Sequence, residues 1–565
     1  MKILIPKHLF LRRNNCNITF SCIKNWSSYV HTNLEPGNVN NKNFTVKELL
    51  TLKPIEREIS VKGWIKALRK HKNIMFIDIN DGSCLENLQV IDENGKTEIS
   101  FGCSVQIEGV LAKSTHKNQE VELKCCSLNV LGKCDGLKFP FLPRHSPTVK
   151  ETRQHLHLRP RTKDFGALLR IRSLATFAVH KFLQERNFLH VNTPIITSND
   201  CEGGGDVFSV QVNPVTSNLI DENISSTECK HYFNVPAYLT VSGQLALEAA
   251  ACAMSKVYTF GPTFRAENTR TRRHLCEFQM IEVEQTFVTL EDLFQLTEEL
   301  FKSSAQYILE KCVKDVELFH SCLTPCYAHH LTKILETPFI SGASCFDLIA
   351  PFGGEICGGS LREDDENQLK IRIRQAGIDS ETLQCIECPM ELEMSENLSD
   401  KGKVLEISGK LVLNLEKEQN YYSLMLNILK FQWGEKLFAE HEDFLLKYCK
   451  NIPIFIKNFP INITPFYMKM SSEKTASCFD LIAPFGGEIC GGSLREDDEN
   501  QLKIRIRQAG IDSETLQWYI ELREFGSVPH GGFGMGFDRF LQTVLAIPNI
   551  REVVPFPRWS HHCQM

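Results

Sequence analysis

Apolar and polar residues alternate in several short stretches near the start of the chain, which is the period-two pattern of half-buried β-strands. An Asn-Asp-Gly turn at residues 80–82 separates two of these stretches. The predicted strands are residues 59–64, 74–79, 88–91, 105–109 and 120–123. Because short strands in such close succession can close on themselves, they predict a small β-barrel over residues 57–133, with the OB-fold as the candidate.

The pattern changes to a helical period beyond residue 160. Apolar residues three and four positions apart predict one long amphipathic helix that ends near Asn187. These residues are Leu168, Leu169, Ile171, Leu174, Phe177, Ala178 and Phe182. Strand-like and helical segments then mix as far as the C-terminus. This mixture predicts a large α+β domain over residues 161–565, joined to the barrel by a linker at residues 134–160.

The bulk composition agrees with an ordinary globular protein of more than one domain, because 565 residues are too many for one hydrophobic core. The formal net charge of −6 neither favours nor excludes a nucleic-acid partner, since phosphate binding depends on local basic patches. The 22 cysteines are scattered, which favours reduced thiols over a disulfide framework. No apolar run reaches the roughly 18–20 residues that span a bilayer, so we expect no membrane-spanning helix.

The N-terminus has the composition of a targeting segment. Residues 1–33 contain no Asp or Glu, and basic side chains stand among apolar ones. This composition predicts a mitochondrial presequence over residues 1–34 and places the protein in the mitochondrial matrix. A disordered basic tail would have the same composition and is the alternative. A secretory signal fits poorly because no continuous apolar core follows the basic residues.

An exact internal duplication interrupts the second domain, where residues 343–384 and 476–517 are identical. Functional repeats diverge and recur in longer arrays, so a single perfect copy indicates a recent exon duplication or an error in the gene model. We therefore expect residues 341–420 to be an insert. The second copy leads into a glycine-rich segment at residues 534–539, and we expect it to occupy the native place in the domain.

Three segments carry the chemistry of the second domain. They are the long helix with residues 188–194, residues 258–267 with the basic loop that follows, and residues 534–539 at the start of a helix. In this order, behind an OB-like barrel, they resemble motifs 1, 2 and 3 of the class II aminoacyl-tRNA synthetases. The aspartyl, asparaginyl and lysyl subgroup is the most similar. The resemblance covers residues 57–335 and 420–558.

The resemblance implies that the domain binds ATP and forms an aminoacyl adenylate. Charge builds on phosphoryl oxygens in that reaction, so fixed cations and Mg²⁺ would give most of the help. Two catalytic arginines follow from the motifs: Arg265 would bind the α-phosphate through its planar fork, and Arg539 would bind the γ-phosphate. His274 would assist Arg539. Phe278 would stack on adenine, and Glu267 would contact its amino edge.

The resemblance also implies a magnesium site, because Mg²⁺ prefers carboxylate and other hard oxygen ligands. In the second copy, Asp480 and Glu488 fall where the subgroup keeps its metal-binding carboxylates. Asp347 and Glu355 are their duplicates in the first copy. We expect these duplicates to take no part in the reaction.

The choice of amino acid depends on residues 242–248, which read Ser-Gly-Gln-Leu-Ala-Leu-Glu. Aspartyl enzymes carry P-Q-x-x-K-Q at this place, and its lysine neutralises the carboxylate of the substrate. Here Leu247 replaces that lysine, and Glu248 adds a negative charge. A buried carboxylate would repel a substrate carboxylate but would accept a hydrogen bond from an amide. The pocket is therefore similar to that of asparagine-specific members.

The remaining contacts follow from the same resemblance. Arg495 would bind the amide oxygen of asparagine, and Glu202 and Gln244 would hold its α-ammonium group. The implied reaction is ATP-dependent activation of asparagine and its transfer to tRNA(Asn) for mitochondrial translation, by a homodimer joined through motif 1. In the barrel, Phe76 and Gln89 are candidate anticodon contacts, although a place in the barrel core is an equally good reading of Phe76.

Two alternatives stay open at this point. Ala246 stands where the family has a histidine, and the insert lies inside the catalytic domain, so the chain could be a catalytically inactive RNA-binding relative. An aspartyl-tRNA synthetase is the second alternative. A lysyl specificity fits less well, because that pocket needs more acidic residues around the ammonium group of the substrate.

Overall fold

The computed structural model describes residues 43–564 except for 73, 96–97, 117–118, 142–145, 199–206, 213–231, 324–326, 342–347, 351–353 and 358–436. The chain divides into two compact units, Met1–Pro147 and Thr148–Met565. The expected presequence at residues 1–34 lies outside the described residues.

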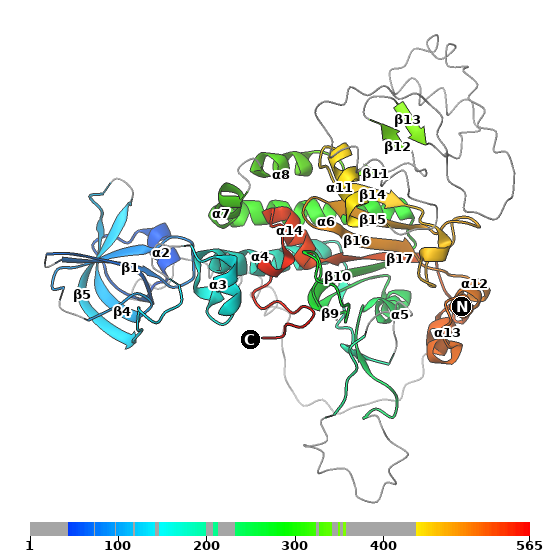
Figure 1. The fold of residues 1–565 in the computed structure, drawn as a ribbon, viewed down its shortest axis with the longest axis horizontal. Coiled ribbons are helices and arrows are strands. Elements are labelled where there is room, and N and C mark those ends of the chain that lie inside the picture. The colour runs from blue at the N-terminus through cyan, green and yellow to red at the C-terminus, as the bar shows by residue number, and fades with distance from the viewer. Residues whose placement is uncertain are drawn as a thin grey trace, which may run out of the picture. The chain divides into compact units, whose positions relative to one another are not determined.

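The first unit is a closed barrel whose strands pair in the order β1-β2-β3-β5-β4 (Figure 1). Its elements are α2 (Val46–Leu52), β1 (Glu58–His71), β2 (Ile74–Asn80), β3 (Leu88–Asp92), β4 (Ser104–Lys113) and β5 (Val121–Gly132). Along β4, Val105, Ile107 and Leu111 point into the core, and residues between them are more exposed. The alternation read from the sequence therefore places one face of each strand inside the barrel, and the predicted OB-fold is confirmed.

The second unit is built on an eight-stranded sheet in the order β11-β14-β15-β16-β17-β10-β9-β6. These strands are β6 (Leu189–His190), β9 (Lys256–Phe264), β10 (Glu277–Thr286), β11 (Ile340–Ser341), β14 (Ile454–Lys457), β15 (Cys478–Ala483), β16 (Gly487–Leu494) and β17 (His530–Gly536). A separate pair is formed by β7 (Ile196–Thr197) and β8 (Tyr238–Leu239). The helices are α3 (Val149–Gln154), α4 (Lys163–Glu185), α5 (Gln244–Met254), α6 (Leu290–Lys311), α7 (Val313–Leu323), α8 (Tyr327–Glu336), α11 (Ala439–Tyr448), α12 (Glu499–Gln508), α13 (Gln517–Glu524) and α14 (Phe537–Leu545).

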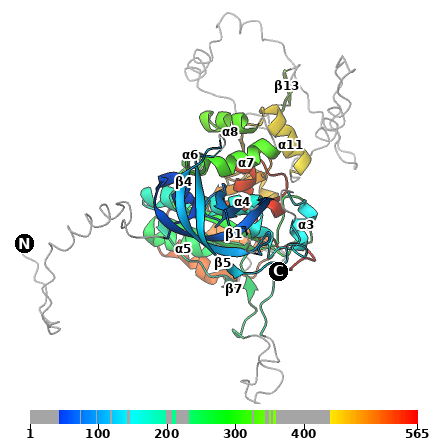
Figure 2. The same ribbon diagram turned by 90° about the vertical axis from the view of Figure 1, so that its left-hand side faces the viewer.

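The sheet is antiparallel at its centre and has a parallel strand at each edge. Neighbours from β14 to β9 run antiparallel, whereas β6 pairs in parallel with β9 and β11 with β14. Helices α6 and α14 pack on the sheet, and α4 and α7 pack against them. Helices α6, α7 and α8 lie next to one another in both views (Figures 1 and 2). Helices packed on an antiparallel sheet make the α+β class that the sequence predicts.

The two copies of the duplicated sequence occupy different places. Strands β15 and β16 of the second copy lie inside the central sheet, between β14 and β17. The corresponding strands of the first copy, β12 (Leu348–Ala350) and β13 (Gly354–Cys357), pair only with each other among the described strands. The two hairpins have the same register. Each also has a register shift at the same position, between Leu348 and Ile349 in the first copy and between Leu481 and Ile482 in the second. The local sequence therefore specifies the hairpin, and the flanking chain decides which hairpin joins the sheet.

Gly532 of β17 lies so close to β10 that a side chain there has no room. A Cβ atom would overlap the carbonyl oxygen of Val283 and the carboxylate of Glu284. We expect Gly532→Ala to lower the free energy of unfolding of this unit by about 1–3 kcal/mol, measured by denaturant unfolding. Gly261→Ala in β9 is the matched control, because a Cβ atom there meets nothing within 4 Å. Equal losses in the two variants would contradict this close packing of β17.

The described cysteines, such as Cys103 and Cys478, are free thiols. Among the described helices, none combines the length and the apolar character that crossing a bilayer requires.

Ionic contacts link distant parts of the second unit. One example is the buried Arg159, which donates hydrogen bonds to the carboxylate of Glu552 at 2.6 Å and to the carbonyl oxygen of Arg551 at 2.9 Å.

Candidate active site

A cavity of about 400 Å³ lies in the second unit and is lined by α5, β10, β16 and β17. It brings together most of the residues that the sequence singles out: Gln244, Arg265, Glu267, His274, Phe278, Asp480, Glu488, Arg495 and Arg539. These side chains come from segments far apart in the chain. The sheet unites them because β10 pairs with both β9 and β17, and β17 pairs in turn with β16 of the second copy.

The first group of side chains surrounds the turn from β9 to β10. Arg265 follows β9 directly, and its backbone N–H donates to the carbonyl oxygen of Cys276 at 3.0 Å, which closes the base of the loop. Its guanidinium carbon lies 5.7 Å from the ring centroid of Phe278. Its Nη1 lies 4.0 Å from Oε1 of Glu267. A cation, an aromatic ring and a carboxylate therefore lie close together on one side of the cavity's loop.

His274 lies on the same loop, with its Nε2 3.8 Å from Oε2 of Glu267. Its Nδ1 forms a hydrogen bond with the hydroxyl of Thr271. Burial and then the positive charge of Arg539 lower the pKa of His274, although Glu267 acts in the opposite direction. A lowered pKa favours the neutral imidazole, so His274 would assist a phosphate as a hydrogen-bond donor and not as a fixed cation.

Arg539 lies in the first turn of α14, and its side chain joins two segments of the site. Its Nε and Nη2 donate to the carbonyl oxygen of Arg273 at 3.3 and 3.2 Å, and its Nη1 donates to the carbonyl oxygen of Glu488. Arg273 in turn pairs with Glu442 of α11 at 2.9 Å. The loop after β9 is thereby tied to β16 and to α11.

The carboxylates of Asp480 and Glu488 face the same cavity from β15 and β16. Burial raises the pKa of Asp480 well above its usual value, and the negative charges of Glu488 and Glu442 raise it further. Carboxylates that repel each other in this way suit a divalent cation. Among the described residues, no group of three His, Cys, Asp or Glu side chains has the geometry of a metal site. The protein would therefore supply few of the ligands, as is usual for Mg²⁺, which keeps several waters.

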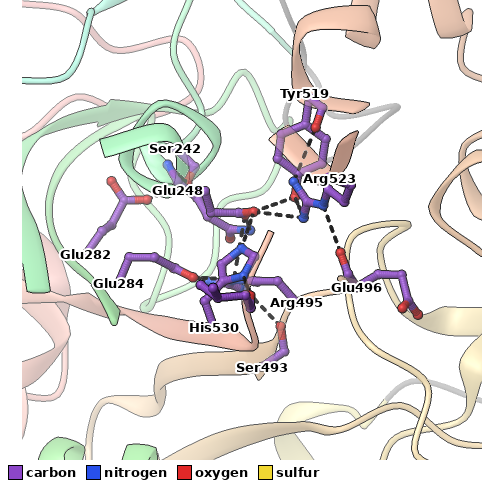
Figure 3. Close-up of polar contacts among 12 residues, drawn as sticks. Ser242, Glu248, Glu282, Glu284, Ser493, Arg495, Glu496, Tyr519, Arg523 and His530 are labelled. Carbon is purple, nitrogen blue, oxygen red and sulfur yellow. Dashed lines mark hydrogen bonds and ion pairs between the residues drawn. The ribbon is translucent and has the colours of Figure 1, made fainter. Parts of the chain in front are cut away.

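Arg495 and Glu284 form the floor of the cavity, and both are buried (Figure 3). Arg495 donates from Nε and Nη2 to the two carboxylate oxygens of Glu284 at 3.2 and 2.9 Å, and from Nη1 to the hydroxyl of Ser493 at 2.7 Å. This two-point contact fixes the plane of the guanidinium. A charged donor and a charged acceptor are therefore held side by side at the end of the cavity.

Glu248 does not line the cavity, which differs from the expected contact with substrate. It is fully buried behind the floor, where it accepts hydrogen bonds from Gln244 at 2.9 Å and Tyr519 at 2.6 Å. Arg523 and His530 each lie 3.2 Å from the same carboxylate (Figure 3). The reason is the packing of α13 against α5, which places Tyr519 and Arg523 over Glu248.

Glu284 is the residue that the sequence reasoning missed. Phe278, Met280, Glu282 and Glu284 alternate along β10, and all four line the cavity. Two carboxylates at alternate positions of one strand, just after the Phe278 already singled out, are the signal that could have found it. The carboxylate of Glu282 has other partners than that of Glu284, because it accepts hydrogen bonds from the backbone N–H of Gly243 at 2.9 Å and from the hydroxyl of Ser242.

Charges around Glu248 hold it ionised. Burial alone would raise its pKa, but the hydrogen bond from His530 and the charges of Arg523 and Arg495 outweigh burial and lower it. For His530, burial would lower the pKa, but the hydrogen bond to Glu248 and the negative charges of Glu248 and Glu284 raise it above 6.5. Both ring nitrogens of His530 face acceptors, the carbonyl oxygen of Val528 at 2.7 Å and Glu248.

This geometry predicts a pH-dependent contribution of His530 to stability. A group whose pKa is raised by folding stabilises the folded state fully at pH values below its pKa in the unfolded chain, which is near 6.5 for histidine. This contribution disappears as the pH rises through the pKa of the group in the folded state. We expect the difference in Tm between the wild-type chain and His530→Gln to be largest at about pH 6 and to shrink towards about pH 9. Thermal unfolding followed by circular dichroism at several pH values measures it. A difference that does not change with pH would contradict an imidazolium at this position.

The other candidate residues lie elsewhere. Glu202 and Asp347 fall outside the described residues, and Glu355 lies in β13, outside the sheet that carries the site. Phe76 and Gln89 belong to the barrel unit. Phe76 is half-buried in β2, and Gln89 of β3 accepts a hydrogen bond from Gln119 at 2.7 Å. Phe76 is thus neither a fully buried core residue nor a fully exposed ring.

Comparisons with known proteins identify the family of this chain. Residues 147–560 match the family of tRNA synthetases class II (D, K and N), and residues 59–131 match the OB-fold nucleic acid binding domain. The chain therefore belongs to the class II tRNA synthetases of the aspartate, lysine and asparagine group. Within that group, the relatives described next are asparaginyl-tRNA synthetases.

Three relatives define that similarity. The human asparaginyl-tRNA synthetase is 39% identical over 511 residues, which cover 89% of this chain and 91% of the relative. A probable mitochondrial asparagine–tRNA ligase from Dictyostelium discoideum is 33% identical over 522 residues, covering 90% and 94%. The asparaginyl-tRNA synthetase structure of Pyrococcus horikoshii complexed with asparaginyl-adenylate has a TM-score of 0.67 at 25% identity, covering 92% of this chain and 98% of that one.

Proposed function

We propose that this chain is an asparagine–tRNA ligase, which activates asparagine with ATP and transfers it to tRNA(Asn). The observation that carries the choice of amino acid is the buried pair of Arg495 and Glu284, which lines the cavity together with Leu247. An amide can accept a hydrogen bond from a guanidinium and donate one to a carboxylate. A substrate carboxylate would instead meet the negative charge of Glu284, and the described residues that line the cavity include no lysine to compensate that charge.

The remaining residues of the cavity account for the activation step. The carboxylate of asparagine attacks the α-phosphorus of ATP, and pyrophosphate leaves. Arg265, above Phe278, stabilises the charge that grows on the α-phosphate while the ring of Phe278 stacks on adenine and Glu267 contacts its amino edge. Arg539 holds the γ-phosphate from the start of α14. In the second step a ribose hydroxyl at the 3′ end of the tRNA attacks the activated carbonyl, and AMP leaves.

We also propose that Asp480 and Glu488, whose carboxylates repel each other, would hold Mg²⁺. When bound, Mg²⁺ neutralises phosphate charge and orients the pyrophosphate group. Gln244 holds the α-ammonium group of the substrate, and its own amide is fixed by a hydrogen bond to Glu248 at 2.9 Å. Glu248 thus acts on the substrate through Gln244 and the floor of the cavity.

Two further proposals concern the state of the protein in the cell. The edge strand β6 exposes Leu189, and Phe177 of α4 and Ile196 of β7 are also exposed, at 48, 54 and 44%. These exposed apolar side chains support a homodimer joined through motif 1, which light scattering after gel filtration would test. The basic composition of residues 1–33 and the Dictyostelium relative support import into mitochondria. A fluorescent fusion that stays outside mitochondria would contradict it.

The experiment that tests the proposed function is aminoacylation of a tRNA(Asn) transcript with radiolabelled asparagine or aspartate. We expect charging with asparagine and little with aspartate. Charging with aspartate would favour the aspartyl alternative. Binding of the transcript without charging by either amino acid would favour the inactive RNA-binding alternative.

A further inference from the structure

Asp538 lines the cavity, but both of its carboxylate oxygens are bound by the protein itself. Oδ1 accepts a hydrogen bond from Nη1 of Arg172 at 2.6 Å, and Oδ2 accepts one from the backbone N–H of Gln279 at 3.1 Å. The side chain of Asp538 is 2% exposed and that of Arg172 is 14% exposed. Because a buried carboxylate is costly unless it is paired and hydrogen-bonded, these two contacts fix where Asp538 lies.

The contact with Gln279 occurs at the place where a strand of the sheet ends. The pairing of β10 with β17 stops at Met280 and Gly536, because β17 turns into α14 directly after Gly536. Gln279 lies one residue beyond this pair, and the carboxylate of Asp538 accepts its N–H in place of a strand carbonyl. The peptide group that Asp538 holds is therefore the one that joins Phe278 to Gln279.

Asp538 thus stands between the two ends of the proposed nucleotide site. On one side, it holds the peptide of Phe278, the ring proposed to stack on adenine. On the other side, it is followed directly in α14 by Arg539, the cation proposed for the γ-phosphate. A shift of Asp538 relative to β10 would therefore change the distance between the ring and the guanidinium.

Arg172 fixes the same turn of α14 to helix α4. Its Nη1 also donates to the carbonyl oxygen of Val553 at 3.0 Å, and its guanidinium carbon lies 5.1 Å from the ring centroid of Phe537. Phe537 and Asp538 are consecutive residues in the first turn of α14, so Arg172 contacts that turn at two points. Arg172 therefore holds the turn against α4 while Asp538 holds it against β10.

We propose that Arg172 and Asp538 are positioning residues for ATP, which set the spacing between Phe278 and Arg539. The inference rests on the proposed function, in which those two side chains bind adenine and the γ-phosphate. Asp538 acts through the backbone of Gln279, and Arg172 acts through Asp538. ATP binding should therefore depend on this ion pair, whereas the floor of the cavity, which is proposed to bind asparagine, should not.

The variants that test this role are Asp538→Asn, Arg172→Gln and Arg172→Lys. The matched control is Arg170→Gln, because Arg170 also lies on α4 and pairs with Asp315 of α7 through two hydrogen bonds at 2.9 and 2.7 Å. That pair is similarly buried, at 19 and 10% exposure, but neither residue is among the described residues that line the cavity. Each protein is assayed for the KM of ATP and of asparagine in pyrophosphate exchange, for the Kd of ATP with Mg²⁺ by titration calorimetry, and for Tm.

We expect Asp538→Asn and Arg172→Gln to raise the KM and Kd for ATP about tenfold, because small misplacements of binding groups are costly. The KM for asparagine should stay within about twofold of wild type. An amide has one acceptor oxygen, so Asp538→Asn can serve Arg172 or Gln279 but not both.

Arg172→Lys should restore ATP binding to within about threefold of wild type, because both hydrogen bonds of Arg172 come from Nη1 and an ammonium group can donate both. The control Arg170→Gln should lower Tm as Arg172→Gln does but leave ATP binding unchanged.

Three results would overturn the positioning role. One is a Kd for ATP in Asp538→Asn and Arg172→Gln that matches that of Arg170→Gln. Another is an equal rise in the KM for asparagine, which would show a general loss of the site. The third is an Arg172→Lys variant that binds ATP as weakly as Arg172→Gln, and this comparison decides the question even if Asp538→Asn does not fold. Because Kd is measured without turnover, a wild-type chain that binds ATP but exchanges with neither amino acid would contradict the proposed function alone.

Discussion

Replacing Arg495 by glutamine is expected to lower asparagine-dependent pyrophosphate exchange by about 10²–10³-fold. The side chain holds Glu284 through two hydrogen bonds and lies 3.7 Å from Glu248, so its loss leaves buried negative charge without its partner. The same change removes the donor proposed for the amide oxygen of the substrate. Exchange kinetics with asparagine, together with Tm, would separate loss of binding from loss of fold.

The duplication supplies an unusual control for this variant. Arg362 stands at the equivalent position of the first copy. Because β15 and β16 of the second copy form the sheet that carries the cavity, Arg362→Gln should leave exchange unchanged within about twofold. Equal losses in the two variants would contradict the assignment of function to the second copy.

Replacing Arg265 by lysine is expected to have a similarly large effect, a loss of about 10²–10³-fold in kcat for exchange. Lysine keeps the charge but not the planar fork that can donate two hydrogen bonds to phosphate oxygens. If Arg265 stabilises the α-phosphate in the transition state, the KM for asparagine should change little. A lysine variant that retains wild-type kcat would show that charge alone suffices and would contradict the role proposed for the fork.

The architecture could be predicted from the sequence because its signals are local. Alternation along residues 59–64 and 105–109 marks strands with one buried face, and the helical period from Leu168 onwards marks α4. The order of the three motifs then placed Arg265 and Arg539 in one cavity, as the pairing of β10 with β9 and β17 does in the structure.

Tertiary packing decided what the sequence could not. Leu247 and Glu248 are neighbours on α5, yet Leu247 lines the cavity whereas Glu248 lies behind it. That difference depends on α13, which comes much later in the chain and brings Tyr519 and Arg523 to Glu248. Glu284 was missed for a related reason. Its role in the site depends on its contact with Arg495, which lies on another segment of the chain.

The duplicated segment shows the same limit in another form. Identical residues form the same hairpin in both copies, with matching registers. Nothing within the repeated residues can distinguish the copies, so the place in the central sheet is set by their neighbours. In the second copy, β15 follows β14 closely and β16 pairs with β17, whose residues lie soon after the repeat.

The most direct test of the proposed specificity for asparagine is ATP–pyrophosphate exchange by the purified wild-type chain with asparagine or aspartate as the amino acid. We expect exchange with asparagine and a kcat/KM for aspartate lower by a factor on the order of 10²–10⁴, because Glu284 opposes a second carboxylate and Leu247 cannot neutralise it. Exchange that is as fast with aspartate, or absent with both amino acids, would contradict an asparagine-specific site.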